Sequence, residues 1–354
     1  MIEPRRDVAL MDGYHSPQVE VEVRLNTNES PFPAPAEWVT EAQALVASIA
    51  WNRYPDRTAT ELRTSIGQLH GVGPEQVFAA NGSNEVLQTL LLTYGGPGRV
   101  AAVWEPTYAL HSHIARITST GIAEGERATD FTLDLSEVQR VFEQDRPSVA
   151  FLCSPNNPTG VVDDEATVRA VLELAIIHDC LLVVDEAYGQ FAPWSALELV
   201  AEDVPLVVTR TYSKTWSMAA ARIGYLVGPC SVVAELQKVV LPYHLDAFKQ
   251  AAGTLALAYV DEMNRRVAAV VEERGRLMDR LAALPVEVWP SGANFVLFRP
   301  LGLDGATVWQ ELLDRSVLVR NCSSWPRLEG CLRVTIGTPE EDDRFLAALE
   351  EILR

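Results

Sequence analysis

The middle of the chain alternates between short apolar runs and segments with helical periodicity. Five runs rich in apolar and β-branched residues lie at positions 77–80, 99–104, 148–153, 181–185 and 205–209. Between them, apolar residues recur three and four positions apart, the pattern of amphipathic helices, over 83–94, 107–117 and 164–179. Strands that are apolar throughout are buried on both faces. The alternation therefore predicts an α/β fold with a mostly parallel sheet between helices.

The pattern changes after residue 245. One long helical stretch runs from Gln250 to Leu284, followed by short strand-like runs, a helix near 305–315 and a closing acidic helix from Pro339. The first 28 residues form an extended segment that contains several turn residues. We therefore predict three parts, which are an N-terminal arm at 1–28, a large domain at 29–245 and a small C-terminal α+β domain at 246–354.

The charge balance limits the partners of the chain. The 48 acidic residues outnumber the 29 basic ones and give a net charge of −19. The negative electrostatic field of such a charge repels nucleic-acid backbones and anionic membranes. In addition, no apolar run approaches the roughly 18 residues of a membrane span. We expect a soluble, cytoplasmic protein that binds neither. The five scattered cysteines include no CxxC pair, which is typical of reduced thiols in the cytosol.

Polar segments follow several of the predicted strands. They are GSNE (82–85), EPTY (105–108), SPNNPTG (154–160), DEAY (185–188) and RTYSKTW (210–216). Ligands of an open α/β sheet bind beyond the carboxyl ends of its strands, so we expect these segments to share one site. The chain has no GxGxxG, Walker A or GxSxG motif. His111 and His113 lie in a helical pattern without a third ligand at metal spacing, so we expect packing or surface roles for them and no metal.

In chain order, these segments and their neighbours resemble the markers of the fold-type I pyridoxal-phosphate aminotransferases. The resemblance rests on YPD (54–56), NGSNE (81–85), EPTY, SPNNPTG, DEAY, SKTWSMAAARIGY (213–225) and LRVTIGTPEE (332–341). The segments LNTNESPF (25–32), LPYHLDAF (241–248) and VLVR (317–320) are similar to the subgroup of histidinol-phosphate aminotransferases. The resemblance implies a large domain with a mostly parallel, seven-stranded sheet and a smaller α+β domain. It also implies transamination of L-histidinol phosphate with 2-oxoglutarate, a histidine-biosynthesis reaction that gives imidazole acetol phosphate and L-glutamate.

The implied cofactor is pyridoxal 5'-phosphate, whose aldehyde, ring nitrogen and ring hydroxyl each need a protein group. By resemblance, Lys214 holds the aldehyde and then acts as general base. Asp185 pairs with the ring nitrogen and keeps it protonated. Asn157 and Tyr188 donate hydrogen bonds to the ring hydroxyl oxygen.

The remaining implied cofactor contacts concern the ring face and the phosphate. Tyr108 stacks on the ring, and the helix that begins at residue 83 presents its first amides to the phosphate. Tyr54 resembles a tyrosine that reaches the phosphate of a neighbouring subunit, which implies a homodimer with shared sites. The other implied phosphate ligands are Gly82, Ser83, Asn84, Thr211, Ser213 and Arg222.

Two arginines are the implied substrate ligands. Arg333, in LRVTIG, would clamp a carboxylate or phosphate, as a planar guanidinium suits. Arg320 would add a second positive charge. Asn28 and Tyr14, both near the N-terminus, are further candidates for substrate contact, with Tyr14 reaching across the dimer.

Two alternatives share the cofactor residues. One is an aromatic amino-acid aminotransferase, because Trp216 and the run Ala219–Ala221 depart from the common wording of the subgroup and could reshape the substrate pocket. A tryptophan next to Lys214 could select a flat aromatic side chain. The other is a pyridoxal-phosphate decarboxylase of a phosphorylated amino acid, which carbon dioxide release would reveal.

Overall fold

The computed structural model describes residues 2–9, 11, 13 and 19–354. Its centre is a seven-stranded sheet in which six strands run in one direction and one strand, β8, which is second from the edge, runs antiparallel to both of its neighbours. The strand order across the sheet is β2 (Val77–Ala80), β8 (Gly224–Val227), β7 (Leu206–Thr211), β6 (Leu181–Asp185), β5 (Val149–Cys153), β3 (Val100–Glu105) and β4 (Gly121–Glu126). The predicted α/β fold with a mostly parallel seven-stranded sheet is confirmed.

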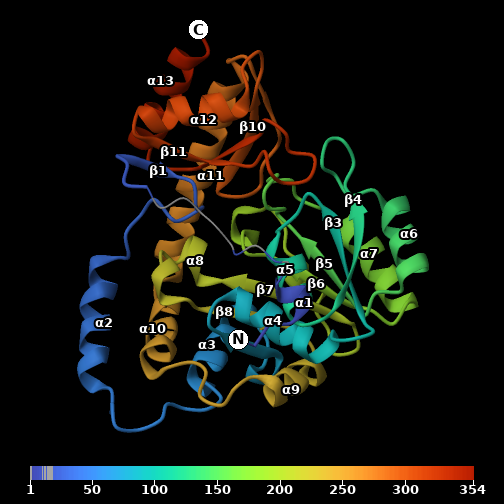
Figure 1. Cartoon of the computed structure of the whole chain (residues 1–354). Coiled ribbons are helices and arrows are strands. Elements are labelled where there is room, and N and C mark those ends of the chain that lie inside the picture. The colour runs from blue at the N-terminus through green and yellow to red at the C-terminus, as the bar shows by residue number, and fades with distance from the viewer. Residues whose placement is uncertain (1, 10, 12, 14–18) are drawn as a thin grey trace.

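Helices cover both faces of this sheet (Figure 1). Alternate residues of one strand point to opposite faces, so Ala101 and Val103 of β3 pack with α4, α5 and α9, whereas Ala102 and Trp104 pack with α6 and α7. Both sets of side chains are buried, which explains why the strands read as continuous apolar runs. These helices are α4 (Ser83–Tyr94), α5 (Leu110–Ile117), α6 (Leu135–Asp145), α7 (Glu165–Ile177) and α9 (Cys230–Val239).

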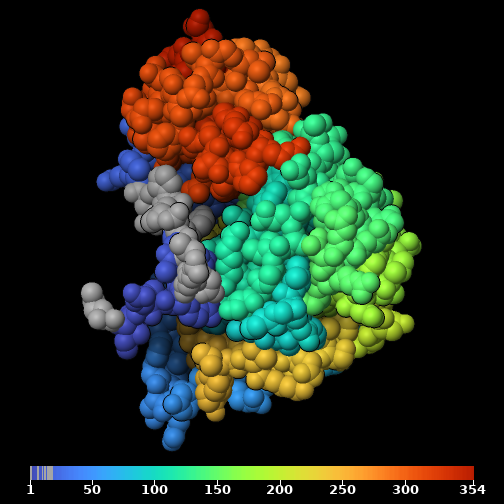
Figure 2. Space-filling model, turned by 45° about the vertical axis from the view of Figure 1, so that its right-hand side comes forward, coloured from blue at the N-terminus to red at the C-terminus, as the bar shows by residue number. Residues whose placement is uncertain are grey.

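The small domain is a second sheet packed against helices. Its strand order is β1 (Val23–Leu25), β11 (Val317–Asn321), β12 (Leu332–Thr335), β10 (Phe295–Pro300) and β9 (Val286–Val288). The helices α12 (Gly305–Asp314) and α13 (Pro339–Ile352) contribute to its core. In Figure 2 this domain, orange to red, forms a lobe above the larger one. The edge strand β1 comes from the N-terminal arm and pairs in parallel with β11.

Two helices replace the single helical stretch predicted from Gln250 to Leu284. They are α10 (Ala247–Leu257) and α11 (Val260–Ala282). Helix α10 packs against α2 (Ala36–Ser48) and α3 (Thr60–His70) beside the large sheet, while α11 continues to the small domain (Figure 1). Short helices are α1 (Arg6–Ala9) and α8 (Tyr212–Thr215). The domain limits at residues 28 and 245 stay a prediction.

A buried carboxyl pair lies between α11 and α13. Asp342 is fully buried, and the Gly337 amide donates to its Oδ1 atom at 3.0 Å. The Glu273 carboxyl of α11 lies beside it and is also largely buried. Burial, together with this neighbouring carboxyl, raises the pKa of Asp342 to about 8.

The Asp342 carboxyl makes stability depend on pH. Because the folded protein holds this proton more tightly than the unfolded chain, the contribution of Asp342 is favourable at low pH and is lost as the pH rises from about 4 to about 8. We expect Asp342→Asn to raise the free energy of unfolding at pH 8.5 by about 1–2 kcal/mol relative to wild type. Urea unfolding at pH 5.5 and 8.5 measures this, with the exposed neighbour Asp343→Asn as control. An equal pH dependence in all three proteins would contradict it.

Candidate active site

A cavity of about 470 Å³ opens where the carboxyl ends of β5, β6 and β7 meet the small domain. It is lined by residues of the large sheet, of the arm after β1 and of strands β11 and β12. Among the residues singled out in the sequence, the structure brings to this cavity Asn28, Ser83, Asn84, Tyr108, Asn157, Asp185, Tyr188, Thr211, Ser213, Lys214, Arg222, Arg320 and Arg333.

Lys214 enters the cavity from α8, which begins directly after β7. The Thr211 hydroxyl caps this helix by accepting from the Ser213 amide. The Lys214 ammonium donates to the Thr27 carbonyl at 3.1 Å and lies 5.8 Å from the centre of the Tyr188 ring. Burial, helped by the positive charge of Arg333, lowers the pKa of Lys214 to about 8. A substantial fraction of the amine is therefore neutral near physiological pH and able to attack a carbonyl carbon.

Asp185 ends β6 with its carboxylate held from three sides. One oxygen accepts from the Thr209 hydroxyl at 3.2 Å and from the Ala187 amide at 3.1 Å. The other oxygen lies 3.0 Å from Nε2 of His111, and both of these side chains are fully buried. A carboxylate fixed in this way keeps its position at the cavity wall and can pair with a cationic ring nitrogen.

Of the packing and surface roles predicted for His111, the structure gives it a buried packing role and adds a polar contact. Its ring stacks on Phe151 with 4.6 Å between centroids and 9° between planes, and it meets the edge of Tyr108 at 5.4 Å. This packing leaves the imidazole little freedom to rotate, so it fixes the Asp185 carboxylate in turn. In the sequence, the only signal for this contact was the spacing of the two residues. His111 lies three positions after Tyr108 in a predicted helix, which places both side chains on one face.

An anion cradle is formed by the start of α4 and the segment after β7. No side chain in the described part of the chain caps this helix at Gly82, so amides at its start, such as those of Ser83 and Asn84, can donate to an anion. Nearby, Arg222 donates to the Ser213 hydroxyl at 3.2 Å, and Ser213 also accepts from Thr211 at 3.0 Å. Gly82 has φ +80°, and a Cβ there would lie 2.6 Å from the Arg222 guanidinium. Only glycine allows this approach.

Opposite the cradle, two buried groups offer hydrogen bonds. The Tyr188 hydroxyl accepts from Asn28 at 2.9 Å, and burial raises the pKa of Tyr188 to about 12, so its own proton remains to donate. Asn157 accepts from Arg333 at 2.5 Å through Oδ1, which directs its amide NH₂ group to other acceptors. Tyr108 donates to Asn84 at 3.2 Å and presents its ring to the cavity.

A pair of arginines occupies the small-domain end of the cavity. Arg320 of β11 and Arg333 of β12 are directly opposite each other in the antiparallel register. Arg333 is 5% exposed and donates to the Asn26 carbonyl at 3.0 Å. Its Nε atom is buried and has no hydrogen-bond partner within the described part of the chain. Two adjacent guanidiniums, one with an unused buried donor, form a site for an anion.

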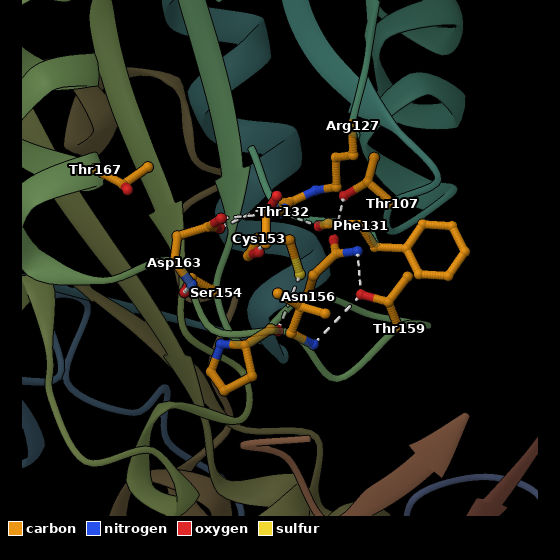
Figure 3. A network of polar contacts seen from close by, with 12 residues as sticks. Thr107, Arg127, Phe131, Thr132, Cys153, Ser154, Asn156, Thr159, Asp163 and Thr167 are labelled. Atoms are coloured by element: carbon orange, nitrogen blue, oxygen red, sulfur yellow. Dashed lines mark hydrogen bonds and ion pairs between the residues drawn. The ribbon is translucent and has the colours of Figure 1, made fainter. Parts of the chain in front are cut away.

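The loop that carries Asn157 rests on a buried polar network (Figure 3). Arg127 forms a two-point ion pair with Asp163 at 2.9 Å, and both side chains are buried. The Asp163 amide donates to Ser154 at 2.9 Å, and Asn156 bonds Thr107 and Thr159. These contacts join the end of β5 to the neighbouring turn and keep the SPNNPTG loop in one conformation.

The family model of class I and II aminotransferases matches residues 20–349. The chain belongs to this family. A histidinol-phosphate aminotransferase of Frankia casuarinae is 46% identical to this aminotransferase over 357 residues, which cover 97% of this chain and 88% of the relative. One of Streptomyces avermitilis is 45% identical, with 96% and 93% covered.

Solved structures of other aminotransferases have the same fold. The crystal structure of histidinol-phosphate aminotransferase from Sinorhizobium meliloti, in complex with pyridoxal-5'-phosphate, superposes with a TM-score of 0.89. The superposition covers all of this chain and 98% of that one at 21% sequence identity. This likeness shows that the aminotransferase has the fold described above.

Some singled-out residues of the aminotransferase lie outside the cavity. Tyr54 is 80% exposed and stacks on Tyr243 at 4.6 Å, and Tyr14 lies outside the described residues. Gly82 does not line the cavity, but its lack of a side chain leaves room for the Arg222 guanidinium, which does. Trp216 and the run Ala219–Ala221 were the residues that could reshape the pocket. Trp216 does not line the cavity and is buried against Tyr212, with 5.5 Å between the ring centres, whereas Ala219 does line it.

Other residues that line the cavity were missed by sequence reasoning. Asn26, Thr27 and Glu29 belong to the LNTNESPF segment, so that motif was the available signal. Cys153, one of the five scattered cysteines, is buried and also reaches the cavity wall. Trp325 lies in the loop between β11 and β12, and no motif marked it.

Proposed function

We propose that this aminotransferase transfers the amino group of L-histidinol phosphate to 2-oxoglutarate, giving imidazole acetol phosphate and L-glutamate, in the cytoplasm. The reaction belongs to histidine biosynthesis. The observation that carries the proposal is the pair Arg320 and Arg333 at one end of the cavity, because two guanidiniums suit a phosphate dianion. The relatives at up to 46% identity support the same substrate. No helix among the described residues could span a membrane.

The cavity fits pyridoxal 5'-phosphate as the cofactor, which when bound supplies an electron sink for the carbanion of the substrate. The uncapped start of α4 and the Arg222 guanidinium, which lies beside Gly82, provide N–H donors and positive charge for a phosphate. Asp185 is available to a protonated ring nitrogen, and Asn157 and Tyr188 to a ring oxygen. Lys214 is the amine that would hold the aldehyde.

Three residues of the cavity have roles in proton transfer or in orienting the cofactor ring. Lys214 would hold the aldehyde of the cofactor and, with its amine free, would take up the proton that leaves the substrate Cα atom. Its lowered pKa keeps the amine able to act as a base near neutral pH. Asp185, held by His111 and Thr209, stabilises positive charge on the ring nitrogen. Tyr108 forms one wall of the cavity and limits the orientation of the ring.

Arg333 binds a different group in each half-reaction. In the first it holds the phosphate of histidinol phosphate together with Arg320, and in the second it holds a carboxylate of glutamate or 2-oxoglutarate. Asn28, which donates to Tyr188 and lies on the arm, lines the same cavity and is a further candidate for substrate contact.

The active unit is a homodimer in this proposal. Four large apolar side chains at two neighbouring loops are exposed in the single chain, namely Trp51, Tyr54, Leu241 and Tyr243. Tyr54 and Tyr243 stack on each other, which joins the two loops into one patch. Exposed apolar patches of this kind are typical of interaction surfaces. This supports the proposal that Tyr54 reaches the phosphate cradle of a partner subunit.

Steady-state kinetics test the proposed substrate. We expect the wild-type enzyme to have a higher kcat/KM for histidinol phosphate than for phenylalanine, without carbon dioxide release. Arg320→Ala should cost about 2–4 kcal/mol for histidinol phosphate, a drop in kcat/KM of about 30- to 1,000-fold, and much less for phenylalanine. Arg333→Ala should reduce both values, because both substrates place an anion on Arg333. A preference of the wild-type enzyme for phenylalanine would assign it to the aromatic aminotransferases instead.

A further inference from the structure

Trp325 lies beside both arginines at the small-domain end of the cavity. Its ring centre is 5.7 Å from the Arg320 guanidinium and 6.0 Å from that of Arg333. The indole also lines the cavity, so it faces the same space as the two cations. One aromatic ring therefore contacts both members of a cation pair that is directly opposed across two strands.

The loop that carries Trp325 is fixed at both ends and in its middle. The Cys322 amide donates to the Cys331 carbonyl at 3.0 Å, and the Trp325 amide donates to the Cys322 carbonyl at 3.0 Å. Leu328 is fully buried in an apolar cluster that includes Phe131 of the large domain. These contacts hold the indole in place relative to the strands.

The same loop is tied to the large domain by Arg327. Its guanidinium donates to the carbonyl of Arg127 and, at 3.1 Å, to the carbonyl of Ala128. Arg127 is itself held by the buried ion pair with Asp163 (Figure 3). The position of Trp325 is therefore set by both domains.

Two like charges opposite each other on adjacent strands repel and tend to separate. An aromatic face within about 6 Å attracts a guanidinium, by about 0.5–2 kcal/mol depending on its solvation. Arg333 is held in addition by Asn157 and by the Asn26 carbonyl, so its position does not depend on the indole alone. The Trp325 ring adds an attraction that both guanidiniums share, and this attraction favours their staying side by side.

We propose that Trp325 is a positioning residue that keeps Arg320 and Arg333 together, and so makes the site selective for a phosphate monoester dianion over a carboxylate. A dianion with three terminal oxygens gains from both guanidiniums, whereas a carboxylate is satisfied by one bidentate arginine. The inference rests on the proposed function, because it assigns the phosphate of the substrate to this arginine pair.

Kinetics of two substitutions at Trp325 test the inference. Trp325→Leu removes the aromatic face and keeps an apolar side chain, and Trp325→Phe restores an aromatic face. We expect Trp325→Leu to raise KM for histidinol phosphate by about 3- to 30-fold, with kcat and the KM for 2-oxoglutarate within about twofold of wild type. Trp325→Phe should recover most of this loss. The matched control is Trp289→Phe, which changes a tryptophan in the same cluster that stacks on Arg299 and does not line the cavity.

Calorimetric titration of the cofactor-loaded enzyme with inorganic phosphate gives a readout that does not depend on turnover. Weaker phosphate binding in Trp325→Leu, with partial recovery in Trp325→Phe, supports the inference. Equal binding and equal KM values in all variants overturn it. A parallel rise in the KM values of both substrates, with a lower melting temperature, also overturns it, because that pattern indicates a purely structural role.

The two proposals fail in different ways. If the wild-type enzyme does not turn over histidinol phosphate, the proposed function is wrong, and phosphate titration of the same variants still decides whether Trp325 organises an anion site. If the wild-type enzyme turns over histidinol phosphate and Trp325→Leu behaves as wild type, only the inference about Trp325 is wrong.

Discussion

Lys214→Ala is expected to reduce the rate of transamination by at least about 10⁴-fold, because it removes both the covalent attachment point of the cofactor and the general base. Steady-state assays with histidinol phosphate and 2-oxoglutarate measure the loss. The variant should also lose the visible absorption of the loaded enzyme. Melting temperatures should stay close to those of the wild-type protein without cofactor, because Lys214 makes one hydrogen bond to the arm.

The small number of lysines makes the attachment point easy to identify. The chain has only three, Lys214, Lys238 and Lys249. Lys238 is exposed on α9 beside Glu235, and Lys249 pairs with Asp246. After borohydride reduction, mass spectrometry of the wild-type enzyme should place the cofactor-derived mass on the peptide with Lys214. Its discovery on either of the other two would refute the assignment of the cavity.

Mixing two inactive variants should restore activity if the sites are shared between subunits. Tyr54→Ala removes the residue proposed to reach the partner's cradle, and Lys214→Ala removes the catalytic amine. A mixed dimer has one site with both residues intact and one site with neither. Random exchange of equal amounts should therefore recover about a quarter of the wild-type activity. Co-refolding of the two variants, followed by assay and sedimentation, measures this.

The control for this experiment pairs two residues of one cavity. Lys214 and Asp185 line the same cavity of a single chain, so a mixture of Lys214→Ala and Asp185→Asn creates no intact site in any dimer. We expect no recovery from that mixture. Recovery there as well, or full activity in a sedimenting monomer, would argue against shared sites.

The central strands could be predicted because apolar runs buried on both faces leave a strong signal in the sequence. Two strands of the same sheet had a weaker signal. β4, with the sequence GIAEGE, has few apolar residues because it lies at the sheet edge. β8 has only four residues, and it begins inside the SKTWSMAAARIGY motif, so the motif and not a strand was recognised there. No glycine or proline marks the break between α10 and α11 in the sequence. The break arises because α10 packs against α2 and α3, whereas α11 packs against α13, β9 and β10 of the small domain.

The sequence could predict those site residues whose location depends only on the course of the backbone. Asp185, Asn157 and Lys214 follow strands, and the carboxyl ends of neighbouring strands meet at one edge of the sheet. The direction of a side chain depends instead on tertiary packing, which sequence spacing does not encode. Trp216 therefore seemed close to the substrate but lies in the core, and Trp325 lines the cavity without any motif.

The pairing of β1 with β11 has a consequence for the order in which the enzyme matures. Glu22 and Ser316, which meet beside this pairing, are 294 positions apart in the sequence, and Arg333 reaches the Asn26 carbonyl across 307 positions. Contacts of such long range form late, because the intervening chain must first be ordered. During synthesis the arm leaves the ribosome well before β11 and β12, so it can pair with its partner strand only after the roughly 290 residues between them have followed. The large domain can therefore fold early, whereas catalytic competence is acquired last, when the C-terminal strands close the cavity over the arm.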